Sequence, residues 1–527
     1  MRLRTATQIK AATLSIALLI PALLWAQDSQ NARHHPPQYK LIDMGTFGGP
    51  GSFGQDPSLP KPLNNRGILV GGAETTAADP NFPNVCLFCG SNIFHALQYR
   101  DGVRTDLGAL PGANSSLANW VSDSGIVAGW SENGAIDPLL GLPEIEAAIW
   151  KHGQVIALGT LEGGYESVAL AVNDRGEVAG VSSNLVPDPF GPLGTENRIF
   201  LWQDGSMRDI GTLGGPDAGF LGLNTGVAMN EAGQIVACSY TGATANPVTE
   251  TPTLNPFLWE HGTMHDLHNL GGTSGCAMFV NNHGQVVGYS NLAGNLQFHP
   301  FLWEHGEMKD LGTFGGNNGF ALWISEAGHV VGRADVTAIC TACDNQLQLH
   351  HPFFWANGTL TDLGLLGNDT AGTAYSVNSK DQVVGISKQC THINTDDGCD
   401  GPVQHAFLWE DGSLFDLQDL IADDSEITLS GATDINERGE IFASGVLPNG
   451  DGHLLLLIPC DGDHLGLEGC NDGMVEASAV ASAQQELRQT SRPSTLPTRR
   501  QRTNQFHVHS LSLRNDSPSK KLQGAMQ

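Results

Sequence analysis

The stretch HPFLWEHGEMKDLGTFGGNNGFALWISEAGHVVGRA, residues 299–334, holds four short strand-like pieces in a fixed order. The first piece ends in Trp303, and the dipeptide His305-Gly306 follows two residues later. Such a dipeptide supplies the positive φ that a two-residue hairpin turn requires. An Asp-Leu-Gly piece, an Ala-x-x-(Val/Ile) piece and a Val-Val-Gly piece complete the unit, which therefore predicts a four-stranded antiparallel sheet.

The same order of pieces recurs along the chain at intervals of roughly fifty residues. The Asp-Leu-Gly type and the Val-Val-Gly type each occur eight times. The aromatic that ends the first piece occurs seven times inside the array, at Tyr99, Trp150, Trp202, Trp259, Trp303, Trp355 and Trp409. With 65 glycines and only 15% charged residues, this repeat predicts an all-β protein rather than several unrelated domains.

The two ends of the array are out of phase with the repeat. The array begins with an Asp-Leu-Gly type strand at Tyr39–Gly45 and ends with the eighth aromatic-type strand, His453–Pro459. Pairing of these two strands would complete the last sheet and remove exposed edges. We therefore expect an eight-bladed β-propeller of four-stranded antiparallel blades, closed by pairing of the N- and C-terminal strands.

The repeat resembles the bacterial probable extracellular repeat proteins of the HAF family, named for residues such as His405-Ala406-Phe407. The triplet varies, since His-Pro-Phe stands at 299–301 and 351–353 and Asn-Pro-Phe at 255–257. The resemblance covers about residues 39–459. It implies an exported, repeat-built protein without an assigned activity, and it transfers no catalytic residues.

The remaining segments differ in composition from the array. Arg2, Arg4 and Lys10 precede the apolar run 11–26, which favours a cleaved export signal over an uncleaved N-terminal anchor. The last residues are rich in Ser, Gln, Thr and Arg, as is typical of disorder. The expected organisation is a signal peptide at 1–26, a linker at 27–38, the propeller at 39–459, a Cys-bounded closing loop at 460–474 and a disordered basic tail at 475–527.

Charge excludes one class of partner. The leader holds three basic residues, and residues 475–527 hold eight basic and three acidic ones, which leaves 15 basic and 52 acidic residues, or −37, for residues 27–474. A phosphate-binding surface is not expected there, so nucleic acid is not a predicted partner. No segment after the leader is apolar enough to cross a bilayer, and we expect a secreted, extracellular or periplasmic protein.

Ten cysteines in an exported chain predict disulfides. Nearness in sequence favours the pairs Cys86/Cys89, Cys340/Cys343, Cys390/Cys399 and Cys460/Cys470. The two C-x-x-C pairs lie in distant repeats, which disfavours a shared zinc site. Cys238 and Cys276 lie within strand patterns and are expected to be buried thiols.

The long insertions between pieces are confined to one kind of connection. In an antiparallel sheet alternate connections emerge on the same face, so the insertions share a face with the glycine-rich links between repeats. They are loops expected at 73–94, 130–146, 182–198, 240–255, 334–350 and 388–404. Variable loops on a rigid scaffold are where binding usually resides.

Two sets of side chains are candidate ligand sites. Trp120, Phe279 and Trp323 hold equivalent places in the predicted inner strands and could stack on a sugar or pack between blades. Carboxylates within short polar loops resemble calcium ligands, although the EF-hand spacing is missing. The candidate calcium residues are Asp396, Asp397, Asp400, Asp461 and Asp463.

No catalytic motif such as G-x-S-x-G, H-E-x-x-H or a phosphate loop is present in the sequence. The leading expectation is a binding module for extracellular polysaccharide or protein, with calcium as the candidate cofactor. The first alternative is a propeller hydrolase or lyase acting on glycans through paired carboxylates. The second alternative is a structural surface protein.

Overall fold

A computed structural model describes residues 36–54, 61–82, 90–191, 194–219, 226–247, 250–340, 348–390, 403–422, 425–462, 464 and 470. The chain divides into two compact units, Met1–Pro37 and Gln38–Gln527. Only residues 36 and 37 of the first unit are described, so the predicted signal peptide, most of the linker and the basic tail lie outside the described residues. All strands discussed below belong to the second unit.

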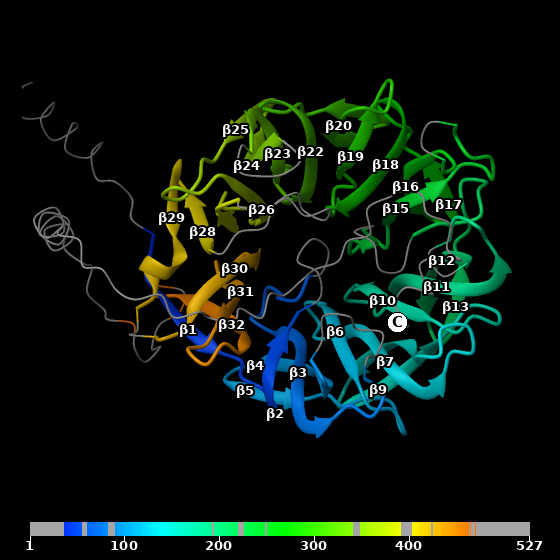
Figure 1. Cartoon of the computed structure of the whole chain (residues 1–527), viewed down its shortest axis with the longest axis horizontal. Coiled ribbons are helices and arrows are strands. Elements are labelled where there is room, and N and C mark those ends of the chain that lie inside the picture. The colour runs from blue at the N-terminus through cyan, green and yellow to red at the C-terminus, as the bar shows by residue number, and fades with distance from the viewer. Residues whose placement is uncertain are drawn as a thin grey trace, which may run out of the picture. The chain divides into compact units, whose positions relative to one another are not determined.

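The described residues form antiparallel four-strand groups, as the repeat predicts. Five sheets have four strands each, and a sixth has twelve. Within the twelve-stranded sheet, single parallel bridges at Leu254–Ser274 and Phe298–Asn318 join three further groups of four strands. The fold is therefore all-β and propeller-like, and we call each group of four strands a blade. Figure 1 shows β10, β26 and β30 at the inner ends of their blades and β13 and β29 at the outer ends.

Each blade is built from strands in four successive positions. The first strands are β2 (Gly48–Phe53), β6 (Ser116–Val121), β10 (Ser167–Val172), β14 (Ala228–Met229), β18 (Gly271–Val280), β22 (Gly315–Ile324), β26 (Ala371–Val377) and β30 (Thr428–Ile435). The second strands are β3 (Leu69–Ala78), β7 (Val127–Ile136), β11 (Val178–Pro187), β15 (Ile235–Tyr240), β19 (Val286–Leu292), β23 (Val330–Ile339), β27 (Val383–Lys388) and β31 (Ile441–Val446).

The third strands are β4 (Asn92–Arg100), β8 (Pro143–Lys151), β12 (Thr195–Gln203), β16 (Leu254–Glu260), β20 (Phe298–Glu304), β24 (Gln348–Ala356), β28 (Gln404–Glu410) and β32 (Gly452–Pro459). The fourth strands are β5 (Val103–Asp106), β9 (Gln154–Gly159), β13 (Ser206–Asp209), β17 (Thr263–Asp266), β21 (Glu307–Asp310), β25 (Thr359–Asp362), β29 (Ser413–Asp416) and β1 (Tyr39–Asp43). A short 3-10 helix, η1 (Leu417–Leu420), follows β29.

The N-terminal strand β1 is the fourth strand of the last blade. It pairs antiparallel with β32, with Tyr39 opposite Pro459 and Asp43 opposite Leu455. The Nδ1 atom of His453 in β32 lies 2.8 Å from Oδ1 of Asp43. The two ends of the array thus build one blade together, with the pairing of end strands that the phase of the repeat predicts.

The turn dipeptides between third and fourth strands adopt the predicted conformation. His305 and Gly306 have φ of 53° and 85°, and Asp101 and Gly102 have φ of 50° and 80°. Two successive positive φ values match the twist of the flanking strands in a hairpin. This explains why the second turn residue is glycine in each of the seven turns.

The glycine of the Val-Val-Gly piece is required for a different reason, which is the close approach of the neighbouring strand. In six of the eight blades the register of the first strand shifts next to it, for example between Ala321 and Trp323, so that one extra residue bulges. The bulge brings the Phe320 carbonyl oxygen within 1.9 Å of where a Cβ on Gly332 would lie. The phenylalanine of the third strand, such as Phe353, is fully buried against the same place.

Two expectations from the sequence are wrong in this region. Cys238 in β15 and Cys276 in β18 form a disulfide between neighbouring blades, with Cα atoms 4.7 Å apart, rather than remaining buried thiols. The segments 130–146 and 182–198 are mostly β-hairpins rather than loops, because β7 and β8 continue as far as Ile136 and Pro143, and β11 and β12 as far as Pro187 and Thr195. Contacts between blades and strand extensions of this kind leave no mark on the local repeat.

Candidate functional site

The three aromatic residues singled out by the repeat lie together. Trp120 of β6, Phe279 of β18 and Trp323 of β22 occupy the position just after the bulge in their strands. The Phe279 and Trp323 ring centroids are 3.7 Å apart and stacked, and those of Trp120 and Phe279 are 6.3 Å apart. Trp120 is 3% exposed, whereas Phe279 and Trp323 are partly buried. A sugar-stacking role for these rings stays a prediction.

A buried carboxyl stands at the equivalent position in β30. Asp434 accepts a hydrogen bond from Ser376 Oγ (3.2 Å) and from the Leu63 backbone N–H (3.4 Å). Burial raises the pKa of Asp434 to about 7, while the charge of Lys61 opposes the rise. The inner strands therefore carry a polar cluster at the same level of the blade as the aromatic one.

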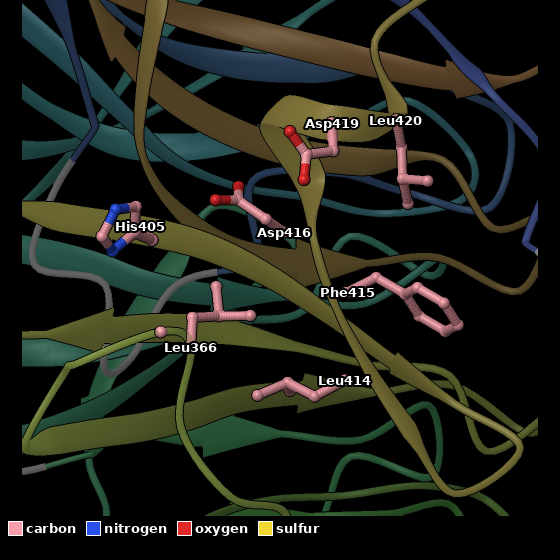
Figure 2. A pocket seen from close by; sticks show the side chains of 8 residues that line it. Leu366, His405, Leu414, Phe415, Asp416, Asp419 and Leu420 are labelled. Carbon is pink, nitrogen blue, oxygen red and sulfur yellow. The ribbon is translucent and has the colours of Figure 1, made fainter. Parts of the chain in front are cut away.

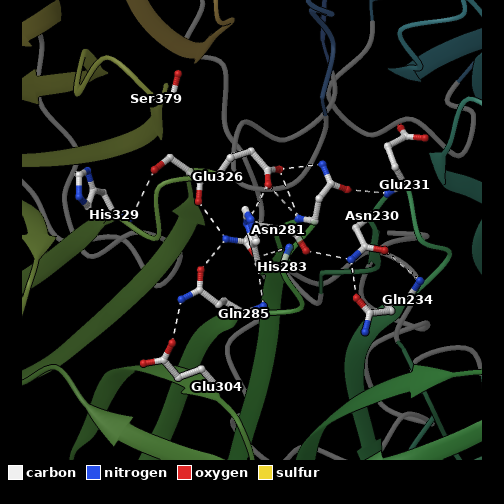
Figure 3. Close-up of polar contacts among 12 residues, drawn as sticks. Asn230, Glu231, Gln234, Asn281, His283, Gln285, Glu304, Glu326, His329 and Ser379 are labelled. Carbon is white, nitrogen blue, oxygen red and sulfur yellow. Dashed lines mark hydrogen bonds and ion pairs between the residues drawn. The ribbon is translucent and has the colours of Figure 1, made fainter.

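Hydrogen bonds between consecutive blades line the face that carries the tight turns. Asn230 Nδ2 donates to the Asn281 carbonyl (2.8 Å), and Asn281 Nδ2 donates to the Ser325 carbonyl (3.0 Å). Figure 3 shows this network together with the carboxylates of Glu231 and Glu326. Because these polar groups bind one another, we assign the network to blade assembly.

The same bonds connect the last blade to the first. Asn436 Nδ2 donates to the Asn64 carbonyl (2.9 Å), and the Glu437 backbone N–H donates to Asn65 Oδ1 (3.1 Å). These contacts join residues more than 370 positions apart in the chain.

Histidines of the third strands bind aspartates of the fourth strands near the outer edge. The His Nδ1 atom lies 2.8 to 3.0 Å from an aspartate oxygen in His95–Asp106, His299–Asp310, His351–Asp362 and His453–Asp43. Burial acts to raise the pKa of each of these aspartates, but hydrogen bonds from the histidine and a backbone N–H outweigh it and lower the pKa. Each of these histidines therefore links the third strand of its blade to the fourth.

The β26–β29 blade departs from this pattern. His405 Nδ1 lies 2.9 Å from Oδ2 of Asp369, a residue of the link that precedes β26. Ser387 Oγ donates to the same oxygen at 2.7 Å. Asp416, which register would place with His405, accepts a hydrogen bond from the Gln418 backbone N–H at the start of η1, as Asp310 does from the Gly312 N–H.

A cavity of about 380 Å³ lies beside this rearranged pair. Its lining comprises Leu366, Gly367, His405, Leu414, Phe415, Asp416, Asp419 and Leu420. Figure 2 shows His405, Asp416 and Asp419 along one part of the cavity and the apolar side chains along the rest. The link, the end of β29 and η1 build it, so the cavity lies toward the face that carries the insertions.

The electrostatics of the cavity are acidic. Burial raises the pKa of Asp416, helped by the charges of Asp419 and Asp369 and opposed by the Gln418 hydrogen bond and by His405. Three carboxyl groups thus surround one histidine. Such a site can accept hydrogen bonds from a donor-rich neutral or cationic ligand, and its apolar wall can take a carbon skeleton.

Exposed apolar side chains occur on the same face. Among the described residues, nine large hydrophobic side chains are strongly exposed, and eight lie near the end of a second strand or between a second and a third strand: Phe82, Ile136, Leu139, Leu185, Val186, Leu296, Ile339 and Val403. We call this face, with the second-to-third connections and the links between blades, the insertion face.

The predicted calcium residues are mostly outside the described part of the chain. Asp396, Asp397, Asp400 and Asp463 are not described. Asp461 binds His464 Nδ1 at 2.7 Å, beside the Cys460–Cys470 disulfide. No group of three or more His, Cys, Asp or Glu residues able to hold a metal occurs among the residues that were described. Calcium therefore stays a prediction.

The cysteine pairs can be compared with their predicted partners. The Cys460–Cys470 disulfide is present as predicted. Cys340 and Cys390 are both disulfide-bonded, but their predicted partners Cys343 and Cys399 are not described, and neither are Cys86 and Cys89. Disulfides are compatible with an extracellular or periplasmic location. In the described ranges, no helix has the length and apolar character needed to span a membrane.

Sequence reasoning missed the cavity. Its signals are Gln418, which stands where the repeat has glycine after Asp-Leu, and Asp369 in a link that is otherwise rich in glycine and leucine. Neither of these departures from the repeat indicates by itself that the histidine of this blade binds a different aspartate from its equivalents.

Comparison with known proteins gives no family for the chain. No family model matches it, and no curated protein matches it. Among solved structures, the β-propeller domain of the trilobed protease from Pyrococcus furiosus is similar at 11% identity and a TM-score of 0.39, over 69% of this chain and 99% of that chain.

Two further structures are similar at the same level. Dipeptidyl peptidase 4 from Porphyromonas gingivalis has 10% identity and a TM-score of 0.42, over 77% of this chain and 56% of that chain. TolB from Acinetobacter baumannii has 12% identity and a TM-score of 0.31, over 80% of this chain and 96% of that chain. Similarities this weak assign neither an activity nor a ligand to the chain.

Proposed function

We propose that the protein is a secreted binding propeller whose insertion face recognises an extracellular polysaccharide or protein. The observation that carries the proposal is that an amphipathic cavity and eight exposed apolar side chains occur on this one face. Exposed apolar groups and partly apolar cavities are typical of interaction sites.

We further propose that the blades form one closed ring of eight, as the HAF-type repeat implies. The pairing of β1 with β32 and the hydrogen bond from Asn436 to Asn64 support closure. A closed ring would fix the positions of all insertions, so that a partner could contact several of them at once.

The charge of the cavity limits the chemical class of ligand that we propose. Asp369, Asp416 and Asp419 face one histidine, and residues 27–474 carry a net charge of −37 as derived above. Anionic polymers would be repelled. The proposed ligand is rich in hydrogen-bond donors and is neutral or cationic.

A printed array of neutral, amino-containing and uronic-acid-containing glycans, probed with the labelled full chain, tests the proposal. The array is run with calcium and with a chelator. Saturable binding to neutral or amino glycans supports recognition, and its loss on chelation assigns a role to the predicted calcium residues. Binding to uronic acids alone contradicts the proposed ligand chemistry. Release of reducing or unsaturated ends during incubation would instead favour the hydrolase or lyase alternative.

A further inference from the structure

Two hairpins of the insertion face place a buried aspartate at the same position. Asp137 follows β7 and Asp188 follows β11, and each precedes a proline. Both are buried, at 2% and 3% exposure. Asp137 Oδ1 accepts the Leu139 backbone N–H at 2.6 Å, and Asp188 Oδ1 accepts that of Phe190 at 3.2 Å. Each aspartate therefore fixes the turn of its own hairpin.

A second buried carboxyl from the next blade faces each of these aspartates. Glu166 lies just before β10, and Asp217 lies in the link before β14. Glu166 Oε2 accepts the Ile145 backbone N–H at 2.9 Å, and Asp217 Oδ1 accepts the Asn197 backbone N–H at 2.7 Å. One oxygen of each carboxyl thus binds the third strand of the preceding blade.

The second oxygens of three of these four carboxyl groups have no donor from the protein. Glu166 Oε1, Asp188 Oδ2 and Asp217 Oδ2 are buried and accept no hydrogen bond from a protein N–H or O–H group. The side chains of Glu166 and Asp137 are nevertheless within hydrogen-bonding contact, as are those of Asp217 and Asp188. A carboxyl–carboxyl hydrogen bond needs one proton, because ionised carboxylates only accept.

The surroundings favour retention of that proton. Burial raises the pKa of Glu166 to about 8, and the charges of Asp137 and Glu144 raise it further, against the Ile145 hydrogen bond. Burial and Asp188 likewise raise the pKa of Asp217.

The other charged or titratable groups around the second pair do not neutralise it. Glu196 adds to the negative field at Asp217. Burial raises the pKa of the Tyr240 hydroxyl, and the charges of Asp217 and Asp188 raise it further. Arg198, the cation of this strand, pairs with Glu196 at 3.0 Å and lies 3.9 Å from Asp209.

We propose that Asp137–Glu166 and Asp188–Asp217 are proton latches, which hold the β7–β8 and β11–β12 hairpins against the next blade and release them when the shared proton is lost. Below the release point each pair carries one negative charge and one hydrogen bond. Above it, two buried carboxylates repel each other across the blade interface. The proposal does not depend on the identity of any partner at the insertion face.

The latches allow one face to change with pH while the scaffold persists. Leu139, Leu185 and Val186 lie at the tips of the two hairpins and are about half exposed. The β19–β20 connection has no such pair among its described residues, since Leu292 binds Gln297 and the turn contains no acid. It is a built-in control within the same molecule.

Hydrogen exchange of the full chain, followed by mass spectrometry and corrected for the intrinsic rate at each pH, tests the latches. Protection of peptides covering 132–146 and 183–197 is expected to fall at least about tenfold between pH 6.5 and 9.5, the effect of one pKa unit of coupling. Protection of the 286–304 hairpin should stay level. Equal protection of the two latch hairpins at both pH values would overturn the proposal.

The matched variant is Glu166→Gln combined with Asp217→Asn. Each amide keeps an acceptor for the third strand and gives the facing aspartate a permanent donor, so the fall in protection should disappear. A fall as large as in the wild type would also overturn the proposal. If this variant fails to fold, Asp137→Asn with Asp188→Asn provides the same test, because asparagine preserves the turn-capping oxygen.

Discussion

His405 binds Asp369 at 2.9 Å instead of Asp416, whereas His299 and its equivalents in three other blades bind the aspartate of their own fourth strand. This exchange of partner coincides with a cavity that combines acids with an apolar wall. Repeat proteins commonly build sites where one copy departs from the others, because the remaining copies maintain the scaffold.

Restoring the common pairing should alter the cavity. In Asp369→Asn, His405 loses its anionic partner and is expected to turn to Asp416. The pKa of Asp416 should then fall below its ordinary value, as it does for Asp310 beside His299. Carboxyl-resolved NMR titration measures this pKa, and an unchanged raised value would show that the exchange of partner does not control Asp416.

The glycine of the Val-Val-Gly piece should not tolerate a side chain. Gly332→Ala places Cβ about 1.9 Å from the Phe320 carbonyl oxygen, so the bulged strand must move. We expect a loss of about 2 kcal/mol or more in the free energy of unfolding. Gly242→Ala is the control, because no atom lies within 4 Å of its Cβ position and its φ is not positive. Denaturant unfolding measures the free energy of unfolding of both variants. Equal values for the two variants would contradict the packing argument.

The disulfide between blades should contribute more than the terminal one. Cys238–Cys276 closes 38 residues and Cys460–Cys470 closes 10. The chain-entropy relation gives about 4 and about 3 kcal/mol for loops of these lengths. Calorimetry of the two Cys→Ala double variants should show the larger drop in Tm for Cys238→Ala with Cys276→Ala. The reverse order would mean that native-state effects outweigh loop closure.

The His–Asp pairs should make stability sensitive to acid. The pKa of Asp310 is lowered in the folded protein, so its contribution is present above the unfolded pKa, near 3.9, and is lost as pH falls through the folded value. Asp310→Asn should therefore make the decline in Tm between pH 4 and pH 2 shallower. Asp204→Asn, at an exposed turn residue without such a partner, should leave the slope unchanged. Identical slopes for wild type and Asp310→Asn would rule out this contribution.

The sequence predicts the features that each repeat determines locally. The turn at His305-Gly306, the order of strands and the pairing of Tyr39–Asp43 with the last strand all follow from the repeat and its phase. The Cys238–Cys276 disulfide could not be predicted, because it depends on the distance between neighbouring blades. The same holds for the facing carboxyls Asp188 and Asp217, which are close only after the blades pack.

The candidate site shows the same limit. The equivalence of Trp120, Phe279 and Trp323 could be read from the repeat, but their mutual stacking depends on how the inner strands converge. The cavity at His405 arises from a link and a 3-10 helix, where the repeat is least regular. Departures from the repeat, such as Gln418, are therefore better guides to function than the repeat itself.

The most direct test of the proposed binding role compares variants of the full chain on the same glycan array. Asp416→Asn combined with Asp419→Asn removes the cavity carboxylates, and Asp204→Asn changes an exposed carboxylate on the face that carries the tight turns. We expect the first variant to lose at least about tenfold in apparent affinity for the glycans that the wild type binds, which corresponds to about 1.4 kcal/mol, and the second to bind as the wild type does. Wild-type affinity in the cavity variant would contradict the placement of the site.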